Sequence, residues 1–129
     1  MNKRKPLSKS EMEIVRVVWD LGKGSVRDVW NAMQESRKMD FTTVQTYLSR
    51  LAEKGYLKFK LVDRARVYSA KVQPRRVIGD TVEEFVGNLF GGEPLPLIRH
   101  LLNETEISPD QLSELRKLLD EAKGRSNDG

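Results

Sequence analysis

The sequence contains no cysteine and a single histidine, His100, and these two shortages exclude several classes of site. Without cysteine the chain cannot form disulfides, use a thiol as a nucleophile or bind a metal through thiolates. No Ser/His/Asp set, metal-spaced cluster or phosphate-binding glycine loop surrounds His100, so we expect it to be a surface or packing residue. We therefore expect no catalytic residue, no metal and no cofactor, and the chain is not expected to be an enzyme.

Long apolar runs are also missing. No segment approaches the roughly 18 apolar residues that a membrane-spanning helix needs. Residues 1–6 are basic but lack the apolar core of a secretory signal. We expect a cytoplasmic protein with no membrane insertion.

The charges of the chain are unevenly distributed. Residues 1–73 contain 16 Lys and Arg against 8 Asp and Glu, a net charge of +8, whereas residues 74–129 contain 7 against 11, a net charge of −4. An asymmetry of this size suggests that the first part meets a polyanion and the second does not. The alternative is an ordinary solvated surface, since many soluble proteins are mildly basic.

Helix starts are marked by capping boxes, in which a side chain at the first position and another three residues later bond each other's backbone amides. Ser8 with Glu11, Ser25 with Asp28, and Thr42 with Gln45 fit this pattern. Three short helices and a hairpin can enclose one small core. We expect its large members to be Trp19, Trp30, Phe41, Tyr47 and Leu51.

Residues 42–70 are the most informative stretch of the chain. Val44, Tyr47, Leu48 and Leu51 form one buried helical stripe, and the opposite face is polar and mostly uncharged. Gly55 ends this helix, and Leu57, Phe59 and Leu61 then alternate with Lys58 and Lys60 as in a strand. Residues 63–66 turn the chain into a second strand over residues 67–70. A helix that fits a major groove beside a basic hairpin is the layout of a winged helix-turn-helix DNA reader.

The exposed residues of this stretch have predicted roles on double-stranded DNA. Thr43, Gln45 and Thr46 are expected to face base edges, because Gln suits a bidentate contact with adenine and a Thr methyl can touch a thymine methyl. Thr42 and the first helical amides are placed for a phosphate. Basic side chains complete the predicted site, with phosphate contacts from the helix and minor-groove or backbone contacts from the hairpin tip: Arg50, Lys54, Arg64 and Arg66. Contacts from Lys58 and Lys60 are less clearly indicated. Thr42 and Gln45 could instead serve only as a cap, and Arg66 only as a cover for the hairpin.

Residues 74–123 read as three further helices whose apolar faces exceed what so short a segment can bury within itself. A second copy of the chain is the economical cover, although these helices could also fold back on the DNA-binding unit of a monomer. A two-fold dimer also suits a palindromic operator. The predicted dimer interface comprises Ile78, Val82, Phe85, Leu89, Leu97, Leu101, Leu112, Leu115 and Leu119. The predicted domains are residues 1–73 for DNA binding, 74–123 for dimerisation, and 124–129 as a disordered tail.

Four segments in the same order resemble the penicillinase-repressor and methicillin-resistance regulator family, which includes copper-responsive repressors of similar build. They are residues 7–19, 43–55, 90–92 and 108–115, and the likeness extends from about Leu7 to about Leu119. The resemblance implies a mostly α fold with a small β-hairpin wing, in which a winged helix-turn-helix precedes a C-terminal helical dimerisation region. It also implies a dimeric transcriptional repressor that binds palindromic operators upstream of resistance or stress-type genes.

The resemblance carries implications for how DNA is released. In several members of the family, a membrane sensor triggers cleavage of the helical region by a regulatory protease at an Asn-Phe pair. This chain has His100-Leu101 at the matching position, a candidate cleavage site whose residues differ from the family's pair. Copper-responsive members release DNA through C-terminal cysteines, which this chain lacks.

Two other functions share the fold. A winged helix can serve as a protein–protein adaptor, since a fold does not determine a function. A nonspecific nucleic-acid binder would show the same dependence on salt but no preference among sequences. The uncharged polar helix face beside Arg64 and Arg66 favours the DNA-reading repressor, because an adaptor has no need of it.

Overall fold

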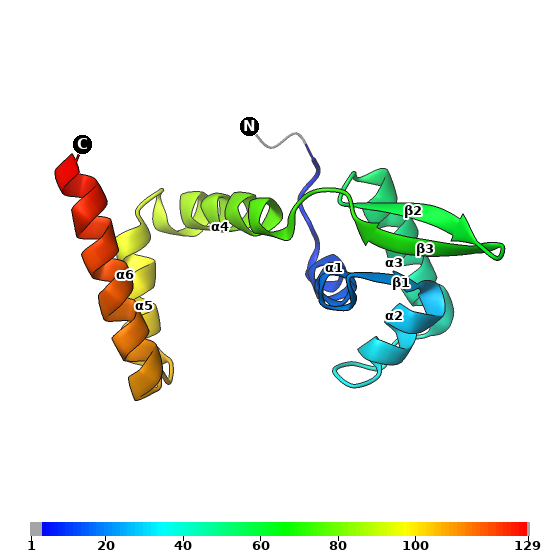
Figure 1. The fold of residues 1–129 in the computed structure, drawn as a ribbon, viewed down its shortest axis with the longest axis horizontal. Coiled ribbons are helices and arrows are strands. Elements are labelled where there is room, and N and C mark those ends of the chain that lie inside the picture. Colours follow the sequence, from blue (N-terminus) through cyan, green and yellow to red (C-terminus); the bar gives the residue numbers. More distant parts are fainter. Residues whose placement is uncertain (1–3, 129) are drawn as a thin grey trace. The chain divides into compact units, whose positions relative to one another are not determined.

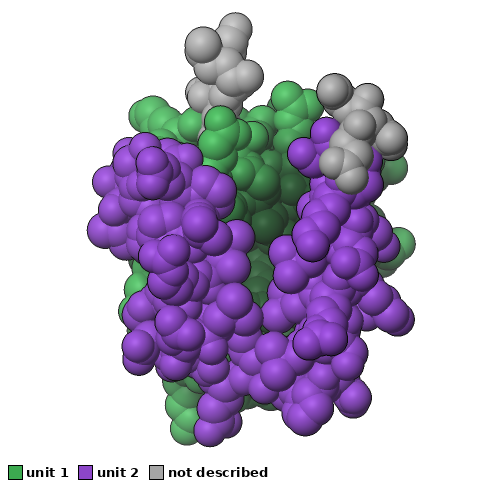
Figure 2. Space-filling view, turned by 90° about the vertical axis from the view of Figure 1, so that its left-hand side faces the viewer, with its two compact units in different colours: residues 1–84 green, residues 85–129 purple. Residues whose placement is uncertain are grey.

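The computed structural model describes residues 4–128 and divides into two compact units, residues 1–84 and 85–129 (Figure 1 and Figure 2). The described residues form six helices and one three-stranded antiparallel sheet, which confirms the predicted mostly α fold with a small β-hairpin. No helix within these residues has both the length and the apolar character needed to cross a bilayer.

The first unit contains all of the strands. Its elements are α1 (Lys9–Leu21), β1 (Lys23–Ser25), α2 (Val26–Met33), α3 (Phe41–Glu53), β2 (Leu57–Val62), β3 (Ala65–Ala70) and most of α4 (Pro74–Phe90). The strands lie in the order β1-β3-β2, and we call the β2–β3 hairpin the wing. Strand β1 was not predicted, because three residues are too few to show an alternating pattern. Its pairing of Ser25 with Val67 brings the start of α2 beside the wing.

The capping boxes predicted at Ser8 and Ser25 are confirmed. The Ser8 hydroxyl accepts from the Glu11 amide (3.3 Å), and the Glu11 carboxylate accepts from the Ser8 amide (2.7 Å). Ser25 and Asp28 exchange the same two bonds at 3.1 and 2.9 Å, so both α1 and α2 have starts fixed by local sequence.

The third capping box, between Thr42 and Gln45, is wrong. Helix α3 begins one residue before Thr42, after Asp40, and no side chain bonds its first amides as a cap. Tertiary contacts hold this helix start instead. The Trp30 indole donates to the Met39 carbonyl (2.8 Å), and the ring of Phe41 packs edge-on against Trp30 with centroids 5.9 Å apart.

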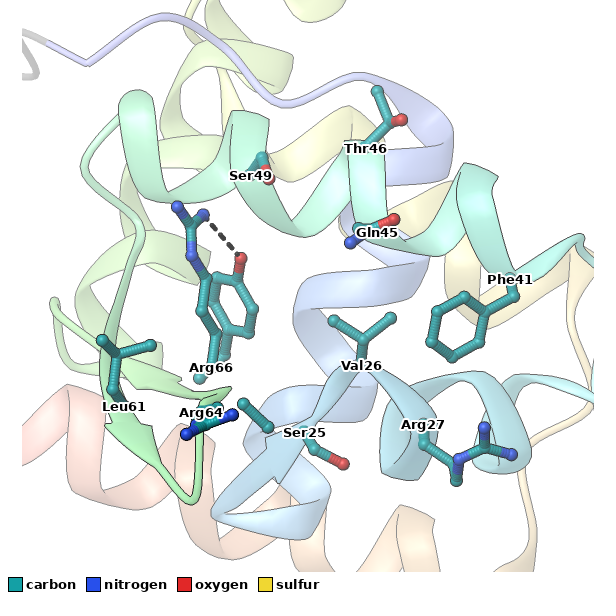
Figure 3. Close-up of a pocket in the computed structure, with 12 residues that line it drawn as sticks. Ser25, Val26, Arg27, Phe41, Gln45, Thr46, Ser49, Leu61, Arg64 and Arg66 are labelled. Carbon is teal, nitrogen blue, oxygen red and sulfur yellow. Dashed lines mark hydrogen bonds between the residues drawn. The ribbon is translucent and has the colours of Figure 1, made fainter.

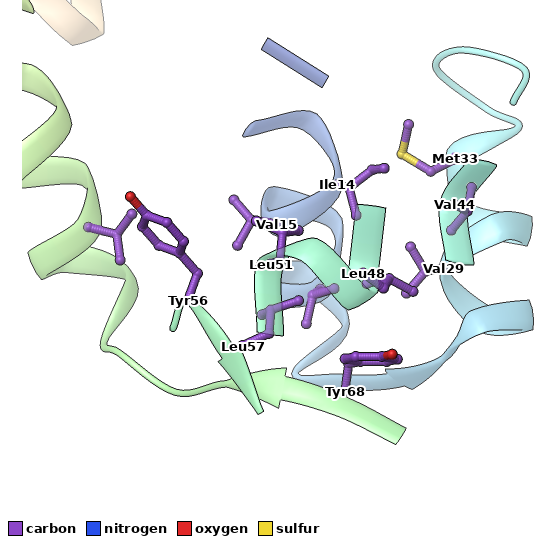
Figure 4. Packing of buried hydrophobic residues seen from close by; sticks show 12 residues of the cluster. Ile14, Val15, Val29, Met33, Val44, Leu48, Leu51, Tyr56, Leu57 and Tyr68 are labelled. Carbon is purple, nitrogen blue, oxygen red and sulfur yellow. The ribbon is translucent and has the colours of Figure 1, made fainter. Parts of the chain in front are cut away.

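The core of the first unit is more aliphatic than predicted (Figure 4). Leu51 is fully buried as expected, but Trp19, Trp30, Phe41 and Tyr47 are only half-buried. Trp19, Trp30 and Tyr47 pack against the edge of this core, whose centre is filled mainly by aliphatic side chains. The buried residues are Ile14, Val15, Val18, Val29, Met33, Val44, Leu48, Leu51, Tyr56, Leu57, Tyr68 and Val77. Tyr56 and Tyr68 are therefore the aromatic residues of the core, and neither was predicted.

The second unit consists of the end of α4, α5 (Pro94–Glu104) and α6 (Pro109–Asp128). Helix α4 begins at Pro74, where the dimerisation region was predicted to start, but the compact units divide at residues 84 and 85 within that helix. Helix α6 continues to Asp128, so residues 124–128 are helical and not the predicted disordered tail. Neighbouring residues 121–123 are good helix formers, and Gly124 alone does not end the helix. Gly129 lies outside the described residues.

Candidate nucleic-acid interface

A groove of about 900 Å³ lies between α3, the start of α2 and the wing (Figure 3). We call it the α3–wing groove. Its lining combines polar, cationic and apolar side chains and comes from the start of α2, from α3 and from the wing: Ser25, Val26, Arg27, Phe41, Gln45, Thr46, Ser49, Leu61, Arg64, Ala65, Arg66 and Tyr68. It thus brings together four of the predicted DNA-binding residues, namely Gln45, Thr46, Arg64 and Arg66.

The polar face of α3 is accessible, and its opposite face is anchored in the core. Gln45 and Thr46 are exposed, whereas Val44 and Leu48 are fully buried. The Thr46 hydroxyl donates to the Thr42 carbonyl one turn earlier (2.9 Å). This bond satisfies the hydroxyl proton within the helix and leaves the methyl group as the apolar contact that Thr46 can offer.

The other predicted residues of α3 are placed less uniformly. Thr42 and Arg50 are exposed, but Thr43 is half-buried, so it presents less surface than predicted. None of these three residues lines the groove. The Arg50 guanidinium carbon lies 5.6 Å from the centroid of the Tyr47 ring, which orients this cation along the helix.

The wing turns more tightly than the sequence predicted. Asp63 and Arg64 alone form the turn, with φ angles of +51° and +67°. Two successive positive φ angles are the geometry of a two-residue hairpin whose twist matches the strands. Arg64 therefore lies at the tip as predicted, but Arg66 belongs to β3, and its predicted place at the tip is wrong.

Arg66 is held against the inner side of the wing. Its guanidinium carbon lies 4.2 Å from the centroid of Phe59, and Nη1 donates to the Tyr68 hydroxyl (3.4 Å). The rings of Phe59 and Tyr68 are themselves in contact, with centroids 5.6 Å apart. Figure 3 shows the guanidinium extending toward Ser49 of α3. Arg66 can therefore cover the hairpin and line the α3–wing groove at the same time.

Lys58 and Lys60 lie on the other side of the wing. Successive residues of a strand point to opposite faces, and in the observed register Lys58 pairs with Ser69 and Lys60 with Val67. These pairs alternate with the pair of Phe59 and Tyr68, whose side contributes Tyr68 and Arg66 to the groove. The two lysines are exposed cations that do not line the groove.

Lys54 is engaged within the fold. Its Nζ lies 2.7 Å from Glu11 Oε1 and 3.1 Å from the Pro6 carbonyl oxygen. Glu11 is only 2% exposed, so its carboxylate depends on this partner. The ammonium charge that was predicted to reach a DNA phosphate is neutralised inside the protein, and we assign Lys54 to stabilisation of the fold.

Competing effects determine the pKa of Glu11. Burial alone would raise the pKa, because it disfavours the charged form. The hydrogen bond from Lys54, the Ser8 amide and hydroxyl, and the charge of Lys54 together outweigh burial, so the pKa lies below the usual glutamate value. The pair therefore joins the start of α1 to the end of α3 in its ionised form.

The predicted site omitted the start of α2. Ser25 and Arg27 line the groove opposite Gln45, and the Arg27 guanidinium carbon lies 5.7 Å from the centroid of Phe41. Ser49 of α3, which was not among the predicted site residues, also lines it. The signal for Arg27 was its position just after a strong helix cap. Without β1, nothing in the sequence placed that cap beside the wing.

Seven of the nine predicted dimer-interface residues are exposed. Leu97 and Leu115 are half-buried, and the others expose between 44% and 65% of their surface: Ile78, Val82, Phe85, Leu89, Leu101, Leu112 and Leu119. The candidate cleavage site, His100-Leu101, lies within α5, and both residues are exposed. The backbone at that site is helical, whereas a protease cleaves an extended chain.

The sequence comparisons with known proteins agree with one another. The penicillinase repressor family model matches residues 7–121. The penicillinase repressor of Bacillus licheniformis is 24% identical over 128 residues, which cover 99% of this chain and 100% of that protein. The methicillin resistance regulatory protein MecI of Mammaliicoccus sciuri is 24% identical over 118 residues, which cover 92% of this chain and 96% of that protein.

Solved structures show the same fold. The solution structure of the Bacillus licheniformis BlaI monomeric form in complex with the blaP half-operator has a TM-score of 0.50 and 27% identity, and the match covers 57% of this chain and 90% of that chain. MarR from E. coli has a TM-score of 0.53 and 13% identity over 90% of this chain and 77% of that chain. These likenesses confirm the predicted winged helix-turn-helix fold.

Proposed function

This chain belongs to the penicillinase repressor family and is a DNA-binding transcriptional repressor; we propose that it binds a palindromic operator as a homodimer. The α3–wing groove and the exposed face of α3 read the DNA in this proposal. Helices α4 to α6 join the two copies. The relative solved in complex with a half-operator supports DNA as the ligand. We call residues 4–73, which contain α1 to α3 and the sheet, the reading unit.

The observation that carries the proposal is the composition of the α3–wing groove. Gln45 and Thr46 offer uncharged polar groups from a helix, while Arg64 and Arg66 supply cations from the facing wing. Uncharged donors and acceptors suit base edges, because they can match a particular base without attracting every phosphate. Flanking arginines suit the backbone, which provides affinity and orientation.

Each side chain has a role in this proposal. Gln45 makes a bidentate contact with an adenine, and the Thr46 methyl contacts a thymine methyl. Thr42, Thr43 and the exposed Arg50 lie along the flanks of the helix and meet phosphates or neighbouring bases. At the hairpin, Arg64 reaches the minor groove or the backbone. Arg66 and Arg27 contact the backbone from the groove walls.

The proposed dimer rests on the apolar faces of the last three helices. Leu89 is 65% exposed and Leu119 is 62% exposed, an unusual state for large apolar side chains at regular helical spacing. A second copy covers such faces without any other partner, and a two-fold dimer presents two reading units to the two arms of a palindrome.

Release of DNA is proposed to follow cleavage between His100 and Leu101 in α5. Both residues are exposed, so a regulatory protease can reach them once the helix opens locally. A cut there separates part of the dimer-forming surface from the reading unit. The names of the relatives, penicillinase repressor and methicillin resistance regulatory protein, suggest a resistance operon as the target.

The reading role of Gln45 is tested by Gln45→Ala on a duplex that the wild-type protein selects from a random-sequence library. The variant should lose about 1–3 kcal/mol of binding free energy and relax the preference at one base pair of each arm. Fluorescence anisotropy with single-base variants of the selected duplex measures both effects. Unchanged affinity and unchanged preference would place the reading face elsewhere.

Matched cationic variants separate the two sides of the wing. Arg64→Ala should weaken binding to all sequences alike and lower the salt dependence, whereas Lys60→Ala removes a charge from the side away from the groove and should have the smaller effect. Equal losses would mean that only net charge matters. Failure of the wild type to select any sequence would favour the nonspecific binder.

A further inference from the structure

Residues 4–7, which precede the N-cap Ser8 of α1, form an ordered segment that we call the N-terminal strap. The Arg4 guanidinium bonds Asp80 of α4 through Nη2 and Oδ2 (3.1 Å). The Lys5 carbonyl accepts from the hydroxyl of the buried Tyr56 (2.6 Å), and the Pro6 carbonyl accepts from Lys54 Nζ (3.1 Å). Leu7 packs against the core. Each residue of the strap is therefore fixed to a segment distant in sequence.

Arg4 is itself oriented by the reading unit. Its guanidinium carbon lies 5.4 Å from the centroid of the Tyr56 ring, which follows the end of α3. The side chains of Arg4 and Asp80 are only 20% and 27% exposed, so water screens this pair less than it would a pair on an open surface. Arg4 thus contacts both Tyr56, which follows the end of α3, and Asp80 in the first half of α4.

Most side chains of residues 74–84 in α4 are exposed. Within the described residues, Val77 is the only α4 side chain in the core cluster of the first unit, since the buried Val86 lies in the second unit, and Ile78 and Val82 are about half exposed. A helix held by one side chain can pivot about it. Asp80 lies three residues after Val77, on the same face and about one turn further on. The pair with Arg4 therefore supplies a second point of attachment, and two points fix a direction.

We propose that the N-terminal strap is a positioning element: through Arg4 and Asp80 it fixes the direction in which α4 leaves the reading unit, and so sets the spacing between the two half-sites that a dimer accepts. Helix α4 is continuous from Pro74 to Phe90 and leads directly into the proposed dimerisation region. The proposal requires that this helix pass the direction set at its start on to the dimerisation region.

The consequence concerns the full operator and not the half-site. Once one reading unit is bound, the second binds with an effective concentration that depends on how closely the geometry matches the second arm. A less firmly fixed α4 lets the second reading unit of the dimer occupy more positions and lowers its effective concentration at the second arm. Contacts within one reading unit are unchanged. The inference rests on the proposed dimer and palindrome.

The test compares Asp80→Asn with Glu83→Gln, which makes the same change of charge at an exposed position of the same helix. The probes are the duplex selected by the wild type, one isolated arm of it, and versions with base pairs inserted or deleted between the arms. Asp80→Asn should bind the full duplex roughly 3- to 10-fold more weakly, bind the single arm unchanged, and tolerate altered spacing better. Glu83→Gln should match the wild type.

A charge reversal provides the rescue. Arg4→Asp combined with Asp80→Arg should restore part of the affinity and of the spacing preference, whereas each reversal alone should not. Equal losses on the full duplex and the single arm, or no loss on either, would overturn the inference. If the wild type itself gains nothing from the second arm, the proposed dimer on a palindrome fails instead. Thermal unfolding of each variant shows that any change in spacing preference belongs to a folded protein.

Discussion

The reading unit and the last three helices are built from similar amphipathic stripes, but only the former buries them within its own chain. In α3, Val44, Leu48 and Leu51 are fully buried. In α6, Leu112 and Leu119 recur at comparable spacing and are about half exposed or more. The stripe alone therefore shows that a helix has an apolar face, and the surrounding chain decides whether that face is already covered. The first region covers its apolar stripes within its own chain, and the described part of the second region leaves its stripes exposed.

Leucine-to-alanine substitutions should give the largest difference between the two regions. Leu48→Ala removes a fully buried side chain from the reading unit and should lower the free energy of unfolding by about 4 kcal/mol. Leu119→Ala should leave the unfolding of the reading unit nearly unchanged and weaken self-association. Urea unfolding and sedimentation equilibrium measure the two effects. Equal effects of both variants on unfolding would show that the last helices are already covered within one chain.

The ion pair of Glu11 and Lys54 should give the next largest effect, and it belongs to the reading unit alone. Glu11→Ala leaves the partly exposed Lys54 ammonium without its carboxylate, which should cost about 2–3 kcal/mol of unfolding free energy. Since the folded pKa of Glu11 is lowered, its contribution is present above the ordinary value of 4.5 and is lost as the pH falls through the folded pKa.

Glu11→Gln, which retains the shape of the side chain, is the variant for this pH test. The difference in unfolding free energy between the wild type and Glu11→Gln should be largest near neutral pH and shrink in acid. Urea unfolding at several pH values measures it. A difference that stays constant through this range would show that the carboxylate charge contributes nothing to stability.

The smallest expected effect is at the wing tip, where one substitution should raise stability and weaken DNA binding. Arg64 has a φ of +67°, which is unfavourable for residues with a Cβ atom, so Arg64→Gly should stabilise the hairpin by about 1 kcal/mol. The same change removes a proposed DNA contact and should weaken binding to the selected duplex. Thermal unfolding and anisotropy should therefore move in opposite directions. A loss of both would mean that the arginine side chain also supports the fold.

The sequence predicted those features that depend on neighbouring residues. The capping boxes at Ser8 and Ser25 are complete within four residues, and the end of α3 at Gly55 requires only the positive φ (+88°) that glycine adopts readily. The periodic stripes predicted the helices, and the alternation after Gly55 predicted the first strand of the wing. These local signals were sufficient for the fold class.

Features that depend on tertiary contacts were missed. The pairing of β1 with β3, which brings Arg27 to the groove, involves only three residues of each strand. The partner of Lys54 is a glutamate 43 positions earlier, and that of Arg4 is an aspartate 76 positions later. A periodic pattern in the sequence does not show which distant residues pair. Lys54 was therefore predicted to contact DNA, and residues 4–7 were read only as part of a basic N-terminus.

The most direct test of the account is a hydroxyl-radical footprint of the wild-type protein on its selected duplex. Two reading units on a two-fold dimer predict two protected segments related by the symmetry of the sequence, with centres about one helical turn or a multiple apart. Gln45→Ala should weaken the protection of both segments together. A single protected segment, or uniform protection along any duplex, would contradict the account.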